Sequence, residues 1–273
     1  MKKIVVAPNS FKGSLTSAEV ADAVERGIKD VFPQCNVVKA GVADGGEGTV
    51  EAIVKAVGGD MYAASVTDPL GRPVKAAYGI VRSGGVKTAV MEMSAASGLP
   101  LLLPDELNPW ITSTYGTGEM ISDALNRGCR KFLVGIGGSA TNDAGTGMLS
   151  ALGVRFLDSS GQRLKGCGRD LESIARIDMS SLMPAARESE FIVACDVNTP
   201  FCGPDGAARV FAPQKGADPQ TAEALDCGMR SFARVIAGQF QTDIVPLSGA
   251  GAAGGLGGAF KAFLNARLTA GIE

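Results

Sequence analysis

The sequence predicts an α/β protein with two domains: an N-terminal doubly wound parallel-sheet domain, and a mixed α/β domain with antiparallel hairpins. Up to residue 59, short apolar strands alternate with amphipathic helices, which is typical of a parallel sheet. Beyond that point short alternating segments are separated by turns, as in hairpins. We expect the first part of the doubly wound domain at residues 1–65 and the mixed domain at 66–250. A glycine-rich loop and helix at 251–273 would lead back to the first domain.

The N-terminal part contains two consecutive strand–helix units, which predict a parallel sheet. Thr16 and Glu19 have the spacing of a capping box, so a helix is expected to begin there. Gly58 and Gly59 are expected to end the second helix. The predicted elements are, in chain order, a strand at 3–7, a helix from residue 17, a strand at 36–42 and a helix at 49–57.

The later part of the chain mixes short strands with helices. Asp218 and Pro219 predict the start of a long helix, and Gly238 predicts its end. The other predicted elements are strands at 62–67, 74–81, 87–93, 132–136 and 190–194, and a helix at 117–126.

Composition indicates a soluble enzyme and argues against several other classes. The formal net charge is −2 with acidic and basic residues interspersed, so no basic face for nucleic acid is expected. No apolar run is long enough to span a bilayer. The six cysteines never form a Cys-x-x-Cys pair, which predicts reduced thiols in a cytoplasmic protein.

The chain contains no histidine. Ser-His-Asp and Cys-His catalysis and imidazole proton relays are therefore excluded. Acid–base work must fall to Asp, Glu, Lys, Tyr or Cys. Phosphoryl transfer fits this restriction, because it depends mainly on positioning, cationic groups and metal-bound phosphates.

Residues 131–148 carry the strongest functional signal. An apolar strand leads into a turn of small and polar residues at 137–143, and a helix is expected to follow. Glycines let backbone N–H groups approach a ligand, and a helix N-terminus favours negative charge. We therefore expect a phosphate here; the alternative is a tight turn without a ligand. The candidate phosphate-binding residues are Gly137, Gly138, Ser139, Thr141 and Asn142.

Two loops follow the first two predicted strands, at the carboxyl ends where open α/β sheets bind ligands. The loop at 9–14 contains Lys12, a candidate cation for phosphate or for a substrate carboxylate. The loop at 43–49 places Asp44 and Glu47 three residues apart, where they are candidates to bind Mg²⁺ or substrate hydroxyls. The alternatives are a solvated lysine and carboxylates that only complement the helix dipole.

A further carboxylate, Asp196, follows the apolar strand at 190–194. It is a candidate to accept a proton from a substrate hydroxyl or to hold a metal, while Arg209 and Lys215 are candidates to neutralise charge. The alternative is an Asx-turn that caps the following loop.

Two glycine patterns leave a second interpretation open. Residues 248–258 contain G-x-G-x-x-G, and residues 135–140 match its looser form, but neither opens an evident βαβ unit. An NAD(P)-dependent oxidoreductase is therefore the runner-up. The P-loop signature is absent, so a kinase of this sequence is not of the P-loop class.

Taken together, the loops resemble those of bacterial glycerate kinases that phosphorylate the 2-hydroxyl of glycerate. The matching segments are, in chain order, 9–15, 43–49, 116–119, 137–148, 195–197, 213–217 and 249–257. The resemblance implies ATP and Mg²⁺ as co-reactants, D-glycerate as acceptor and 2-phosphoglycerate as product. It also implies two α/β domains around a cleft.

Under this resemblance each candidate residue receives a role. The expected catalytic residues are Lys12, Asp44 and Asp196, and the expected metal ligands are Asp143 and Asp44. The expected substrate-binding residues are Ser10, Glu47, Arg209 and Lys215. The expected nucleotide-binding residues are Gly137, Gly138, Ser139, Thr141, Asn142, Gly251 and Gly254.

The chain departs from the family pattern at two places. Asn9 stands where the family usually has Asp, which removes a carboxylate from the first loop. Family members also continue beyond the equivalent of Glu273, with strand–helix units that complete the first domain. We therefore expect an unpaired sheet edge and an exposed apolar face in the N-terminal units. The chain would then be either a shortened, inactive fragment that binds ligand, or one whose partner, for example in a homodimer, covers that face.

Overall fold

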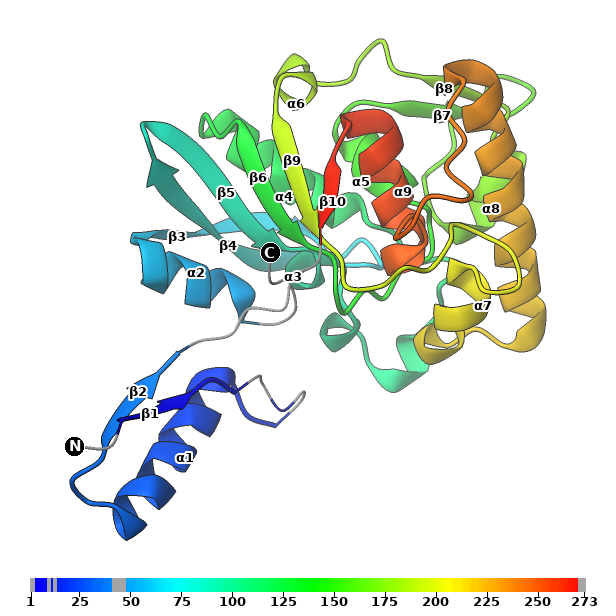
Figure 1. The fold of residues 1–273 in the computed structure, drawn as a ribbon. Helices are drawn as coiled ribbons and strands as arrows, with labels where there is room; N and C mark the ends of the chain where they lie inside the picture. Colours follow the sequence, from blue (N-terminus) through cyan, green and yellow to red (C-terminus); the bar gives the residue numbers. More distant parts are fainter. Residues whose placement is uncertain (1–2, 9–10, 12–13, 41–47, 270–273) are drawn as a thin grey trace.

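The computed structural model describes residues 3–8, 11, 14–40 and 48–269. The strands of this part form three sheets, with parallel and antiparallel pairs and helices between them, which confirms the mixed α/β class (Figure 1). The two small sheets are the parallel pair β1 (Lys3–Val6) and β2 (Asn36–Lys39), and the antiparallel pair β7 (Arg155–Leu157) and β8 (Arg176–Asp178).

The six-stranded sheet is the centre of the molecule. Its strands are, in spatial order, β10 (Arg267–Thr269), β9 (Glu190–Ala194), β6 (Lys131–Gly135), β5 (Val86–Glu92), β4 (Pro73–Ser83) and β3 (Gly59–Thr67). The pairs β3–β4 and β4–β5 are antiparallel, which confirms the predicted hairpins. The strands β5, β6, β9 and β10 are parallel, so their carboxyl ends meet at one edge.

Helix boundaries follow local sequence signals closely. Thr16 and Glu19 form the predicted capping box, and Asp218 accepts the backbone N–H of Thr221 as an N-cap. The long helix passes Gly238 and ends at Phe240, where Gln241 is left-handed, so the expected end at Gly238 was too early. The helices are α1 (Ser17–Val31), α2 (Thr49–Val57), α3 (Ser94–Ser97), α4 (Tyr115–Asn126), α5 (Thr146–Ala151), α6 (Pro184–Arg187), α7 (Ala207–Phe211), α8 (Pro219–Phe240) and α9 (Ala252–Leu264). Short 3-10 turns span Leu99–Leu101, Pro104–Glu106, Gly168–Ser173 and Pro213–Lys215.

The two faces of the six-stranded sheet bury different helices. Val50 and Val54 of α2 pack on one face in a small cluster with Val81 and Val90. Gly79 permits this contact, because a Cβ there would lie 2.2 Å from a methyl carbon of Val54. The opposite face belongs to the main core, to which α4, α5, α8 and α9 contribute. Although α2 follows β2 in the chain, it therefore packs on the six-stranded sheet.

The N-terminal unit of β1, α1 and β2 lies to one side of the six-stranded sheet (Figure 1). Its large exposed apolar side chains include those of Val5, Val24 and Val31. Near the other end of the chain, β10 pairs with β9, so residues 252–269 pack on the six-stranded sheet. The domain limits at 65/66 and 250/251 stay a prediction. Within the described ranges, no helix has the length and apolar character needed to cross a membrane.

Candidate functional site

The candidate site lies where the parallel strands of the central sheet end. Glu92 is in register with Gly135, Gly135 with Ala194, and Ala194 with Thr269. The loops after these positions carry the predicted residues Gly137 to Asp143 and Asp196. Four strands thus bring segments more than 170 residues apart in sequence to one edge, the usual place for ligands in an open α/β sheet.

The glycine turn, defined here as residues 137–145, exposes only its first residues. Gly137 and Gly138 lie at the surface, and Ser139 is 6% exposed. Gly138 has φ +72°, a left-handed conformation that few other residues adopt. Within the described part of the chain, the N–H groups of Gly137 and Gly138 donate to no protein acceptor. Two exposed N–H groups without protein partners are able to donate hydrogen bonds to an anion.

Thr141 and Asn142 are buried beneath this surface. Both side chains are inaccessible to solvent, and the amide of Asn142 approaches the sulfur of Met229 at 3.2 Å. Among the described residues, neither Thr141 Oγ1 nor Asn142 Oδ1 has a hydrogen-bond partner. These two predicted phosphate ligands therefore support the turn from the core, and their side chains do not reach its outer face.

Asp143 uses its carboxylate to hold the turn together. It accepts hydrogen bonds from the backbone N–H groups of Thr114, Gly145 and Gly147 at 2.7, 3.0 and 3.2 Å, and from the Thr114 hydroxyl at 2.8 Å. Burial raises the pKa of Asp143, and these donors act in the opposite direction. The Ser113 hydroxyl adds a longer contact of 3.5 Å, and a carboxylate engaged by so many protein donors is not arranged to bind a metal ion. In the described part of the chain, no group of three or more acidic or cysteine side chains could hold one.

The second glycine-rich stretch packs directly against the turn. Gly254 is left-handed, with φ +67°, and a Cβ there would lie 2.2 Å from the carbonyl oxygen of Thr141. A Cβ on Gly251 would lie 2.1 Å from the carbonyl oxygen of Pro200. Both predicted nucleotide-binding glycines are buried. Their absent side chains allow close packing of backbone on backbone.

Lys215 is also buried under the glycine turn, with only 1% of its surface exposed. Its ammonium group donates to the Ser139 hydroxyl and to the carbonyl oxygen of Thr141, both at 2.7 Å. Burial lowers the pKa of Lys215 to about 7, and the charge of Asp143 opposes that shift. The residue predicted to bind substrate thus contacts the turn itself.

Asp196 lines a cavity of about 320 Å³ at the same edge of the sheet. Asn198 and Ser248, which the sequence interpretation did not single out, line it too, and the Ser248 hydroxyl donates to Asn198 Oδ1 at 2.8 Å. Cys195 contributes a thiol whose pKa is raised by burial. The exposed Asp196 therefore lines a small cavity of mixed polar and apolar character, at the end of the strand that pairs with β6.

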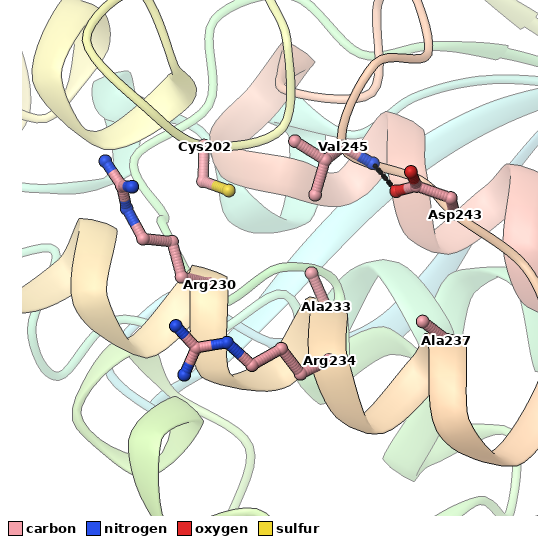
Figure 2. A pocket seen from close by; sticks show the side chains of 7 residues that line it. All are labelled: Cys202, Arg230, Ala233, Arg234, Ala237, Asp243 and Val245. Atoms are coloured by element: carbon pink, nitrogen blue, oxygen red, sulfur yellow. Dashed lines mark hydrogen bonds between the residues drawn. The ribbon is translucent and has the colours of Figure 1, made fainter.

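Arg209 lies away from this edge, on α7. It pairs with Glu223, and its Nε is 3.7 Å from a carboxylate oxygen of the buried Asp226. Asp226 also pairs with Arg230 at 2.8 Å. Arg230 lines a second cavity, of about 400 Å³, beside α8. Figure 2 shows it near Cys202 and Arg234, with Asp243 on the far side. The structure does not bring Arg209 to the glycine turn.

Glu92, which the sequence interpretation did not single out, lies at the same edge of the sheet. Its buried carboxylate at the end of β5 accepts the backbone N–H of Val50 at 3.0 Å. The signal was available, because Glu92 ends an apolar strand just as Asp196 follows one. The predicted residues Ser10, Lys12, Asp44 and Glu47 lie outside the described residues.

These features describe an α/β protein with exposed backbone donors and a carboxylate at neighbouring strand ends, an arrangement compatible with a small-molecule kinase outside the P-loop class. A model of the Glycerate kinase family matches residues 4–273. The chain belongs to the glycerate kinase family.

Individual relatives agree with this assignment. A glycerate kinase of Haemophilus influenzae is 48% identical over 271 residues, which are 99% of this chain and 71% of that protein. The glycerate 2-kinase of Escherichia coli is 47% identical over the same shares. A crystal structure assigned to glycerate kinase 2 of Salmonella typhimurium LT2 has a TM-score of 0.87 at 46% identity, and the match covers 99% of this chain and 72% of that one.

The comparisons decide between the interpretations of the sequence. They establish a glycerate kinase and lend nothing to the oxidoreductase alternative. They also give no support to the expected absence of the family's C-terminal part, since the matches run over 99% of this chain.

Proposed function

We propose that the protein transfers the γ-phosphoryl group of ATP to the 2-hydroxyl of D-glycerate, yielding 2-phosphoglycerate and ADP. One observation carries this proposal: the exposed N–H groups of Gly137 and Gly138 and the carboxylate of Asp196 follow two directly paired strands. An anion site beside a proton acceptor is the arrangement that phosphoryl transfer needs. The E. coli relative, a glycerate 2-kinase, supports the choice of hydroxyl.

The triphosphate is assigned to the glycine turn. The N–H groups of Gly137 and Gly138 point to no protein acceptor in the described part and can donate to phosphate oxygens. The Ser139 hydroxyl lies next to them. Phosphoryl transfer requires little covalent chemistry from a protein, so donors fixed in place are its main contribution.

The acceptor is assigned to the cavity that Asp196 lines. The carboxylate of Asp196 orients the 2-hydroxyl of glycerate and accepts its proton as the new oxygen–phosphorus bond forms. The bond between the γ-phosphorus and the β–γ bridging oxygen breaks at the same time, and ADP leaves with that electron pair. Asn198 and Ser248 line the cavity and can hydrogen-bond the other oxygens of glycerate.

The N-terminal loops supply the remaining proposed roles. Lys12 and Ser10 are assigned to the substrate carboxylate, and Asp44 and Glu47 to the Mg²⁺ ion that accompanies the ATP phosphates. ATP thus enters as its magnesium complex. A cytoplasmic location and a homodimer belong to the same proposal.

The test is to incubate the purified protein with ATP, Mg²⁺ and D-glycerate and to follow the products by phosphorus NMR. The expected result is ADP with 2-phosphoglycerate. A 3-phosphoglycerate product would overturn the choice of hydroxyl, and binding of ATP without turnover would favour the inactive, ligand-binding alternative.

A variant pair tests the role of Asp196. Asp196→Asn removes the proton acceptor and is expected to lower kcat by a factor on the order of 10²–10⁴. Asp205→Asn is the matched control, because this exposed aspartate lies nearby in sequence and outside the cavity lining. Equal rates for Asp196→Asn and the unaltered protein would remove this residue from the mechanism.

A further inference from the structure

The strongest unassigned feature is the buried contact between Lys215 and the glycine turn. The 3-10 turn Pro213–Lys215 delivers this side chain, which then crosses to residues more than 70 positions earlier in the sequence. Its ammonium group is 2.7 Å from both the Ser139 hydroxyl and the carbonyl oxygen of Thr141. With 1% of its surface exposed, Lys215 does not itself present a charge to substrate.

We propose that Lys215 is a positioning residue, which holds the glycine turn in its anion-binding shape and acts on bound phosphate through the Ser139 hydroxyl. This inference deepens the proposed function and rests on it. It replaces the direct substrate contact that the sequence predicted for Lys215.

Hydrogen-bond chemistry explains how one residue acts through the other. A protonated lysine is only a donor, so the Ser139 oxygen accepts from it. The single hydroxyl hydrogen of Ser139 is then free to donate elsewhere. In this proposal it donates to a phosphate at the outer face of the turn, where Gly137 and Gly138 present N–H groups. A donor that is itself polarised by an ammonium group binds an anion more strongly than an isolated hydroxyl.

The charges around the glycine turn also favour a bound anion. In the described part of the chain, no carboxylate lies within ion-pair distance of the Lys215 ammonium group. Asp143 is the carboxylate whose charge acts on the pKa of Lys215, and its oxygens accept hydrogen bonds from Thr114, Gly145 and Gly147. A buried cation without a direct counter-ion is costly, so burial lowers the pKa of Lys215, and an anion bound above it favours the protonated form.

Lys215→Met keeps the length of the side chain and removes its charge. We expect the KM for ATP to rise tenfold or more while the KM for glycerate stays within twofold. Amide hydrogen exchange of residues 137–145 should become at least tenfold faster. The matched control is Lys261→Met, on the exposed side of α9, which should change none of these values. A folded Lys215→Met protein with unchanged ATP affinity and exchange would overturn the proposal. So would a rise in the KM for glycerate alone.

A double-mutant cycle separates action through Ser139 from a purely structural role. If Lys215 acts through that hydroxyl, Lys215→Met combined with Ser139→Ala should bind ATP no more weakly than Lys215→Met alone. If the double variant instead loses ATP affinity by the product of the two single losses, the two side chains act independently and the proposal is wrong. Should Lys215→Met not fold, Ser139→Ala decides: a tenfold loss of ATP affinity is required, and unchanged affinity overturns the inference.

The readouts also keep this inference apart from the proposed function. ATP binding by calorimetry and exchange of the turn need no glycerate. A protein whose ATP affinity depends on Lys215 but which forms no phosphoglycerate would support the inference and overturn the proposed function. If the protein forms 2-phosphoglycerate and Lys215→Met changes neither turnover nor ATP affinity, the proposed function stands and this inference is wrong.

Discussion

The carboxylate of Glu92 accepts the backbone N–H of Val50 at 3.0 Å, across 42 residues of sequence. This hydrogen bond fixes the first turn of α2 to the end of β5, beside the candidate site. A carboxyl oxygen that accepts from the first turn of a helix satisfies one of the N–H groups that have no partner within the helix.

Replacing Glu92 by leucine should loosen α2. The Val50 N–H would be left buried without its acceptor, so we expect a loss of about 1–3 kcal/mol in the free energy of unfolding. Urea denaturation measures the loss, and hydrogen exchange should show faster opening of α2. Glu190→Leu is the control, because Glu190 pairs with Lys131 at 3.1 Å on the surface and should cost about 0.5 kcal/mol or less. Equal losses in both variants would contradict the prediction.

Asp143→Asn should be strongly destabilising. The asparagine amide would place donor hydrogens against the N–H groups of Thr114, Gly145 or Gly147, which now bind a carboxylate. We expect a loss of about 3 kcal/mol or more, measured by urea unfolding. The exposed Asp105 forms no such network, and Asp105→Asn should leave stability nearly unchanged. A mild effect at Asp143 would mean that its carboxylate is not structural.

Two glycines should respond in opposite directions to substitution by alanine. Gly254→Ala would force a side chain into a left-handed residue and against the carbonyl oxygen of Thr141, so we expect a loss of about 2 kcal/mol or more. Gly238→Ala, inside α8 with open space around it, should stabilise by about 0.5–1 kcal/mol. Thermal unfolding compares the two, and a tolerated Gly254→Ala would contradict the close packing described above.

Stability should depend on pH through Lys215. Burial lowers the pKa of its ammonium group to about 7 in the native state, whereas an unfolded lysine titrates near 10.5. Between these values the unfolded chain binds one proton more than the native chain. The free energy of unfolding therefore gains up to about 1.4 kcal/mol per pH unit from this group as pH rises.

The control for this prediction is Lys215→Met, which lacks that contribution. Other groups titrate in the same range, so the informative quantity is the difference between the two proteins in urea midpoints from pH 7.5 to 9.5. The unaltered protein should gain stability relative to the variant as pH rises. Parallel curves would show that the pKa of Lys215 is not lowered.

Local signals in the sequence were sufficient for much of the fold. The capping box of Thr16 and Glu19, the N-cap Asp218 and the alternation of the hairpin strands each act within a few residues, and the structure confirms them. The location of the glycine turn after β6 was predictable for the same reason. The end of α8 was harder to predict, because a helix that packs against the core can continue through a glycine such as Gly238.

The tertiary structure alone decided which side chains of the site face solvent. Thr141, Asn142 and Asp143, in the glycine turn, and Lys215, a basic residue in a later loop, are ligand candidates in the sequence. Packing by α8, α9 and the 3-10 turn at Pro213–Lys215 buries all four, and leaves Gly137 and Gly138 exposed. Sequence determines where a turn forms because its signals are local. Burial depends on contacts across more than 70 residues, which no local pattern contains.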